Sequence, residues 1–198
     1  MELTVDAMGD KCPVPLVKAK KALATMDEGT LEMIVDNETS VTNLMNFGKS
    51  QNCEVSREQL AANKFSVKIV KTADSAPVAS ASCAGGVGPR VVVVPSRYMG
   101  HGDDELGDVL IKAFIFALTQ QDELPDSILF YNGGIFLTCE GSPVLDDLKK
   151  LEEAGVEIWS CGTCLMHYKM EDKLAVGQAT NMYVIVEKQL QAGVVVRA

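Results

Sequence analysis

Apolar and polar residues alternate at three places in residues 1–71, and this period of two is typical of strands with one buried face. The alternating stretches are Glu2–Asp6, Leu31–Val35 and Lys64–Lys71. A further strand is expected near Cys53–Ser56. These stretches predict a sheet in the first part of the chain.

Two helices are expected between these strands. The first begins at Cys12-Pro13-Val14-Pro15, because proline suits the first helical turn, and it runs to about Met26 and stops near Gly29. The second begins at Thr39 or Ser40 as its cap. Its apolar side carries Val41, Leu44 and Met45. The resulting order βαβαββ predicts a two-layer α/β sandwich.

From residue 89 onward, apolar strands alternate with amphipathic helices. Val91–Val94 is a β-branched run typical of a strand that is buried on both faces. Asp103 or Asp104 begins a helix whose expected apolar side comprises Leu106, Val109, Leu110, Ala113, Phe114, Ala117 and Leu118. The other expected elements are strands at Ile128–Tyr131, Val156–Trp159 and Val194–Val196, and helices from Ser142-Pro143 to about Gly155 and from Thr180 to Gln191. This alternation predicts a doubly wound, mostly parallel sheet.

Residues 72–88 have the composition of a flexible linker. Eleven of these 17 residues are Ala, Ser or Gly, and Asp74 is the only charged one, so the segment buries too little to offset its ordering entropy. The sequence therefore predicts two domains, residues 1–71 and residues 89–198, each large enough to fold alone.

Composition and charge narrow the function classes. Apolar residues make up 47% and charged residues 23% of the 198, which is typical of a globular protein. No apolar run reaches the length of about 18 residues that a membrane span needs, and the N-terminus lacks a secretory pattern, so we expect a cytoplasmic protein with reduced thiols. The net charge is −9, with 9 basic against 17 acidic residues in 72–198. Without a basic cluster, neither nucleic acid nor a membrane is an expected partner.

Cys12 is the leading candidate for a reactive thiol. It lies at the expected start of the first helix, where free N–H groups and the helix dipole favour an anion. Pro13 and Pro15 fix the turn, and Lys11 and Lys18 can add positive potential. The competing interpretation is a buried structural cysteine.

Cys161 and Cys164 form a CxxC pair directly after an expected strand, where open parallel sheets place their ligand sites. Three functions compete for this pair: a redox dithiol, a sulfur-carrying thiol with its resolving partner, and half of a zinc site. The pair can also be without function. Only His167 is a nearby additional zinc ligand in the sequence.

The remaining candidates are weaker. Cys53 is expected in the core, and Cys83 falls in the linker. Cys139 follows an apolar run and can share the Cys161 pocket, while His101 can polarise an anion at the same edge of the sheet. The glycine-rich pieces Gly100-His101-Gly102 and Asn132-Gly133-Gly134 are interpreted as turns.

Two known families share motifs with this chain. Through Asp6-Ala7-Met8-Gly9 and Cys12-Pro13-Val14-Pro15, residues 1–71 resemble the TusA/SirA sulfur-carrier family. Residues 90–196 resemble the DsrE/F-like sulfur-relay family through Gly102–Gly107, Glu140-Gly141-Ser142, Gly155–Ile158, Cys161–Leu165 and Thr180–Tyr183. The fused arrangement resembles the YedF-type family, which is linked to selenium metabolism. The resemblance implies a persulfide on Cys12 and a reactive thiol at Cys161, with Cys164 beside it.

The leading hypothesis is a relay that passes a persulfide or perselenide from Cys12 to Cys161. The resemblance implies a cysteine desulfurase-type donor, an unidentified acceptor and a homo-oligomer formed through the second domain. No metal or organic cofactor is required, and any enzymatic activity is expected to be sulfurtransferase-like. The alternatives are a thiol–disulfide oxidoreductase that uses Cys161 and Cys164, and a non-enzymatic adaptor or regulatory protein, with or without a structural zinc ion.

Overall fold

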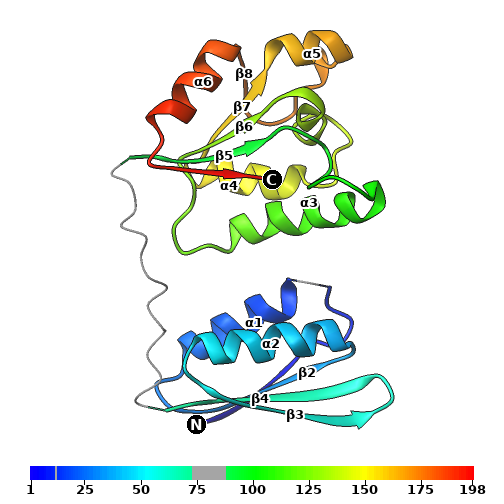
Figure 1. The fold of residues 1–198 in the computed structure, drawn as a ribbon, viewed down its shortest axis with the longest axis vertical. Helices are drawn as coiled ribbons and strands as arrows, with labels where there is room; N and C mark the ends of the chain where they lie inside the picture. The colour runs from blue at the N-terminus through cyan, green and yellow to red at the C-terminus, as the bar shows by residue number, and fades with distance from the viewer. Residues whose placement is uncertain (12, 73–87) are drawn as a thin grey trace. The chain divides into compact units, whose positions relative to one another are not determined.

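The computed structural model describes residues 1–11, 13–72 and 88–198, so Cys12, Cys83 and nearly all of the expected linker lie outside the described residues. The chain divides into two compact units, Met1–Cys83 and Ala84–Ala198. Figure 1 shows the elements of each unit. No helix in the described part of the chain is long and apolar enough to cross a membrane.

The first unit has the predicted βαβαββ order. Its elements are β1 (Glu2–Asp6), α1 (Val14–Ala24), β2 (Gly29–Val35), α2 (Glu38–Ser50), β3 (Glu54–Ala61) and β4 (Lys64–Lys71). The sheet has the order β1-β2-β4-β3, in which β1 and β2 are parallel and the other pairs antiparallel. Both helices cover one face of this sheet (Figure 1), so the α/β sandwich is confirmed.

The alternation of β2 and β4 fixes which face of the first sheet is buried. Leu31, Met33 and Val35 are fully buried, and Phe65, Val67 and Ile69 pack in the same cluster. The helices contribute Ala19, Leu23, Val41 and Leu44 to that cluster. The predicted strand faces are therefore correct, because a period of two can bury only one set of side chains.

Two predictions for the first unit were wrong in detail. Helix α2 is capped by Asn37, whose Oδ1 accepts a hydrogen bond from the Ser40 backbone N at 2.8 Å, and not by Thr39 or Ser40. Strand β3 extends to Ala61, well past the expected Ser56. Nearly all of β3 is exposed at the edge of the sheet, so its sequence lacks the apolar alternation that reveals a strand.

The second unit is built on a five-stranded sheet in which every pair is parallel. Its order is β8-β7-β6-β5-β9. The strands are β5 (Arg90–Val94), β6 (Ser127–Phe130), β7 (Glu157–Cys161), β8 (Gln178–Thr180) and β9 (Val194–Arg197). The helices are α3 (Asp104–Thr119), α4 (Leu145–Glu153), α5 (Gly162–Tyr168) and α6 (Met182–Gln191), with short 3-10 helices η1 (Asn132–Leu137) and η2 (Glu171–Lys173). The predicted parallel, doubly wound class is confirmed.

Helices bury both faces of this sheet. Ile111 and Ile115 of α3 and Leu148 and Leu151 of α4 pack with Val92, Val94, Ile128, Phe130 and Ile158 on one face. Ile185 of α6 packs with Val91, Val93, Leu129 and Cys161 on the other. The β-branched run Val91–Val94 is therefore buried on both faces, as its sequence predicts.

Two helix starts in the second unit differ from the predictions. Residues 178–180 form strand β8, and the last helix begins at Met182 with Asn181 as its cap, not at Thr180. Helix α4 begins at Leu145, because the Ser142 hydroxyl accepts a hydrogen bond from the Val144 N in the preceding turn and does not cap the helix.

The apolar side predicted for α3 was also wrong. Leu106, Val109 and Leu110 are 56%, 57% and 41% exposed, whereas Gly107, Ile111 and Ile115 face the core. Phe114 and Leu118 pack only partly against that core. Helix α3 carries apolar residues around much of its circumference, so periodicity alone did not identify the buried side.

The orientation of α3 predicts opposite effects for two adjacent alanine substitutions. Ile111→Ala should lower the free energy of unfolding of the second unit by about 2–5 kcal/mol, because it leaves a cavity in a fully buried position. Leu110→Ala, the matched control, should change it by less than about 1 kcal/mol. Urea unfolding followed by the fluorescence of Trp159, the only tryptophan in the chain, measures both. Equal losses would contradict the observed orientation.

Candidate functional site

Helix α1 begins directly after the position of Cys12, which itself lies outside the described residues. Pro13 is the N-cap residue, and the helix has neither a side-chain cap nor an acidic residue in its first turn. The Val14 N donates to the Lys11 carbonyl at 2.9 Å, and the exposed Lys11 precedes the turn. Since the Val14 N–H is bonded and Pro15 has no N–H, the dipole of α1 is the main contribution of this helix start to an anion.

An ion pair fixes the residues that precede this turn. Lys18 Nζ lies 2.5 Å from Asp10 Oδ2 and also donates to the Asp6 carbonyl at 3.2 Å. The Lys18 charge is therefore balanced by Asp10, and the acidic residue next to Lys11 has a cationic partner. Pro15 is buried and, with Pro13, Leu16, Ser40 and Asn43, lines a small hollow between α1 and α2.

Asp36, which directly follows β2, also holds the loop after β1. The Gly9 N donates to Asp36 Oδ2 at 3.0 Å, and the Asn37 side chain donates to Asp36 Oδ1 at 2.7 Å. These bonds, the one to Asn37 first, lower the pKa of Asp36. Gly9 has a φ of +79°, a left-handed conformation that glycine adopts without strain. The backbone before residue 12 is thus fixed by polar contacts.

Cys161 and Cys164 lie together at the carboxyl end of β7. Cys161 is the last residue of the strand and the N-cap residue of α5, and it is 1% exposed. Cys164 lies in the first turn of α5 and is half-buried. The CxxC spacing places the two thiols close enough for Cys161 to raise the pKa of Cys164.

A backbone amide from another loop contacts this thiol pair. The Asn132 N donates to Cys164 Sγ at 3.1 Å. Burial, followed by the hydrogen bond to Cys161, raises the pKa of Cys164, and the bond from Asn132 opposes this shift. Asn132 is the first residue of η1 and has a φ of +49°.

The structure does not place the other candidates with this pair. Cys139 is fully buried in the α3–α4 core, on the face of the sheet opposite to Cys161, and burial raises its pKa. His101 is exposed on the loop between β5 and α3. Cys53 is buried in the first unit, as predicted, and its Sγ donates to the Gln51 carbonyl at 3.6 Å. Among the described residues, no group of three His, Cys, Asp or Glu side chains could hold a metal ion.

Asn132 is a site residue that the sequence analysis missed. The piece Asn132-Gly133-Gly134 was interpreted as a turn, but it begins a 3-10 helix packed on β5. A Cβ at Gly134 would lie 2.0 Å from the Val94 carbonyl oxygen, so only glycine fits there. The position of the piece, directly after a strand of a parallel sheet, was the signal that could have identified it.

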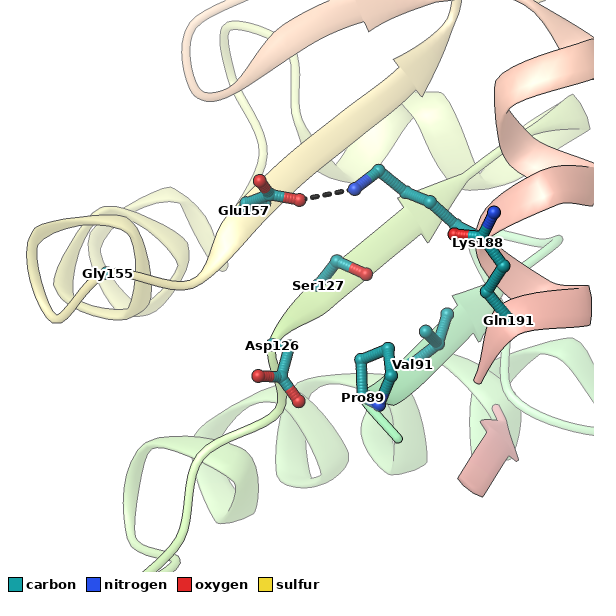
Figure 2. Close-up of a pocket in the computed structure, with 8 residues that line it drawn as sticks. All are labelled: Pro89, Val91, Asp126, Ser127, Gly155, Glu157, Lys188 and Gln191. Carbon is teal, nitrogen blue, oxygen red and sulfur yellow. Dashed lines mark hydrogen bonds and ion pairs between the residues drawn. The ribbon is translucent and has the colours of Figure 1, made fainter. Parts of the chain in front are cut away.

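A separate polar pocket lies at the end of the sheet where the strands begin, opposite to the end that holds Cys161 (Figure 2). It is lined by Pro89, Val91, Asp126, Ser127, Gly155, Glu157, Lys188 and Gln191, which surround the amino ends of β5, β6 and β7. Lys188 Nζ lies 2.5 Å from Glu157 Oε2, and this contact lowers the pKa of Glu157. Glu157 begins β7 and Cys161 ends it, which puts them about 13 Å apart at the rise of a strand. The pocket is therefore distinct from the dithiol.

The first unit identifies the family of the chain. Residues 3–71 match the model of the sulfurtransferase TusA. Over 68 residues the chain is 34% identical to the candidate sulfur carrier protein MJ0990 of Methanocaldococcus jannaschii, and the match covers 34% of this chain and 91% of that protein. The chain belongs to the TusA family, and its first unit is a sulfur carrier domain of the TusA and SirA kind.

Solved structures are similar to each unit. The SirA-like protein DSY4693 of Desulfitobacterium hafniense is 33% identical, with 34% of this chain and 95% of that chain covered and a TM-score of 0.33. For the second unit, the ychN protein of E. coli is 16% identical, with 56% and 99% covered and a TM-score of 0.45. MTH1491 of Methanobacterium thermoautotrophicum, a protein of unknown function, is 22% identical, with 56% and 99% covered and a TM-score of 0.43. For the second unit the likeness concerns the fold alone.

The two raised pKa values predict the alkylation pattern of the folded protein. Cys164 should reach half of its maximal rate with iodoacetamide at a higher pH than an ordinary thiol, because less of it is thiolate at any given pH. Cys139 should stay unlabelled, since it is fully buried as well. Peptide mass spectrometry from neutral pH to about pH 10 measures both rates. The same thiols in urea are the control, and a folded Cys164 that reacts faster than the unfolded one contradicts the prediction.

Proposed function

We propose that this protein relays sulfur within one chain, from a persulfide on Cys12 to the Cys161–Cys164 pair. The observation that carries the proposal is the joining of a TusA-type carrier domain to a second unit that holds two thiols close together. A carrier needs one accessible thiol. A release site needs two thiols that lie close to each other. The proposal gives the first role to Cys12 and the second to the Cys161–Cys164 pair.

The transfer steps are thiol–persulfide exchanges. The Cys12 thiolate attacks the outer sulfur of a donor persulfide, the donor sulfur–sulfur bond breaks, and the donor cysteine leaves as a thiolate. Cys161 then attacks the outer sulfur on Cys12 in the same way, and Cys12 leaves. The helix start after residue 12 stabilises the Cys12 thiolate in both steps. The persulfide is the only group that the relay has to carry, and no metal or organic cofactor takes part.

The burial of Cys161 restricts the second transfer step, from Cys12 to Cys161. Cys161 is only 1% exposed, so the first turn of α5 has to open before the thiol can reach an incoming persulfide. Cys164 is the more exposed of the two and is the competing point of entry. The linker composition of residues 72–88 supports an approach of the two units to each other.

The proposed partners follow from this chemistry. The donor is a cysteine desulfurase-type persulfide, and the acceptor is a molecule that takes sulfur from the second unit. The cytoplasm is the proposed compartment, because both exchange steps need reduced thiols. Selenium is the proposed alternative cargo, on the basis of the resemblance to the YedF-type fusion, and it would travel as a perselenide.

A thiol–disulfide oxidoreductase is the second candidate function. The proximity of Cys161 and Cys164 favours it, since two adjacent thiols can form a disulfide without Cys12. The two functions differ in their dependence on Cys12, which only the relay requires.

Loading with a cysteine desulfurase and cysteine should add sulfur to Cys12 and then to Cys161. Intact-protein and peptide mass spectrometry should find both adducts in the parent, only the Cys12 adduct in Cys161→Ser, and none in Cys12→Ser. In Cys164→Ser the adduct on Cys161 should accumulate, because its resolving thiol is absent. Repetition with a selenium donor tests the alternative cargo.

Cys53→Ala is the matched control, because it removes another cysteine of the first unit and should load like the parent. Equal loading of Cys12→Ser and the parent would overturn the relay. Reversible disulfide formation at Cys161 and Cys164 without any sulfur adduct would favour the oxidoreductase. An adduct on Cys164 in Cys161→Ser would reverse the order of the two thiols.

The second unit is proposed to pair with a second copy through β9. This strand is the last in its sheet, and Val194, Val195 and Val196 are 39%, 46% and 41% exposed. Charged side chains usually block pairing at the edge of a sheet. Residues 194–196 carry none, and Arg197 is the first charged residue of this strand. Two copies of one strand can pair antiparallel around a twofold axis, so the edge is complementary to itself.

Light scattering after size exclusion should therefore find a dimer in the parent and a monomer in Val195→Lys. Val109→Lys is the control, because it places the same charge on the exposed side of α3. A monomeric parent, or a dimer that Val109→Lys alone disrupts, would show that β9 is not the interface.

A further inference from the structure

We propose that the backbone N–H of Asn132 stabilises Cys164 as the resolving thiolate of the pair, and that Tyr168 is the positioning residue that holds Asn132 in place. This inference rests on the proposed function for the identity of the cargo. The contacts that carry it belong to the second unit alone.

One face of α5 holds Asn132 at two points. Cys164 and Tyr168 are four residues apart on this helix, so their side chains lie on the same side. Cys164 Sγ accepts the hydrogen bond of the Asn132 N at 3.1 Å, and the Tyr168 hydroxyl donates to Asn132 Oδ1 at 3.0 Å. A single residue of η1 is therefore bound through both its backbone and its side chain.

The backbone conformation of Asn132 makes these contacts specific. Its φ of +49° lies in the left-handed region, which asparagine tolerates better than most residues. The next turn is fixed by Gly134, which lies against the Val94 carbonyl. The N–H of Asn132 is thus aimed at Cys164 by a backbone held on both sides, and Tyr168 fixes the side chain.

Tyr168 is itself held by aromatic packing. Its ring centroid lies 4.8 Å from that of Phe136 in η1 and 4.9 Å from that of His167. Removal of the hydroxyl alone leaves both ring contacts in place. Tyr168→Phe is therefore a clean test of the bond to Asn132.

The resolving step needs a thiolate at Cys164. That thiolate attacks Sγ of a Cys161 persulfide, the Cys161–Cys164 disulfide forms, and the bond from Cys161 to the outer sulfur breaks. The outer sulfur leaves as hydrosulfide with the bonding electron pair, and the thiol proton passes to solvent. The outer sulfur is reduced by two electrons as the two cysteines are oxidised, and an external dithiol then restores the pair.

The charge that forms on Cys164 has one backbone donor aimed at it. Burial and the nearby Cys161 both disfavour the thiolate, so the Asn132 N–H acts against the two largest unfavourable effects. A hydrogen bond to a charged group is stronger than one to a neutral group, and the donor therefore contributes most when the thiolate is present.

The test measures the alkylation rate of Cys164 and the release of sulfide in the full chain that carries Cys12→Ser. Because this chain lacks the carrier thiol, the result does not depend on the relay. In Tyr168→Phe, the rate of Cys164 alkylation at neutral pH should fall about threefold, and its pH midpoint should rise. After treatment with inorganic polysulfide, the release of sulfide should slow by a similar factor. Tyr183→Phe, an exposed tyrosine on α6, is the matched control and should change neither rate.

Asn132→Gly provides an independent variant, because glycine adopts the same positive φ and keeps the backbone N–H. It should reproduce the effect of Tyr168→Phe, and the double variant should be no slower than either single one, since both remove the same contact. Additive effects, or parent rates in both single variants, would overturn the positioning role. Parent-like sulfide release by Cys164→Ser would overturn the role of Cys164, whatever the outcome of loading at Cys12.

Discussion

The second unit depends on one constraint, which is that a parallel sheet must be covered on both faces. Val91–Val94 and Ile128–Phe130 are almost fully buried, and no polar face is available to turn toward water. Helices therefore have to return across the sheet between parallel strands, with α3 and α4 over one face and α6 over the other. The carboxyl ends of all the strands then lie at the same end of the sheet. The segments that follow β6 and β7, which are η1 and α5, meet there. The contact between Asn132 and Cys164 follows from this arrangement.

The two units place their candidate thiol positions in different surroundings. The first unit offers an uncapped helix start, and its nearby charges Asp10 and Lys18 compensate each other. In the second unit, partial burial favours the neutral form of Cys164 and the backbone amide of Asn132 opposes that effect.

The polar pocket of Figure 2 illustrates why a cavity alone is a poor guide to the site. Glu157 and Lys188 form an ion pair in it, and the pocket borders the amino ends of the strands. The candidate thiols lie at the carboxyl end of β7 and in the first turn of α5, away from this pocket. For thiol exchange, the contact between sulfur atoms and their donors matters more than the size of a cavity.

The sequence by itself determined the elements whose signal is local. Alternation identified the buried faces of β2 and β4, the β-branched run identified β5, and the CxxC spacing placed Cys161 and Cys164 within one helical turn of each other. Tertiary structure alone decided which side of α3 is buried, that Gln178–Thr180 is an edge strand, and that Cys139 and Cys161 lie on opposite faces. It also brought Asn132 to Cys164 across 32 residues. The physical reason is that periodicity records a residue's neighbours along the chain, whereas burial and a hydrogen-bond partner depend on segments that only the fold brings together.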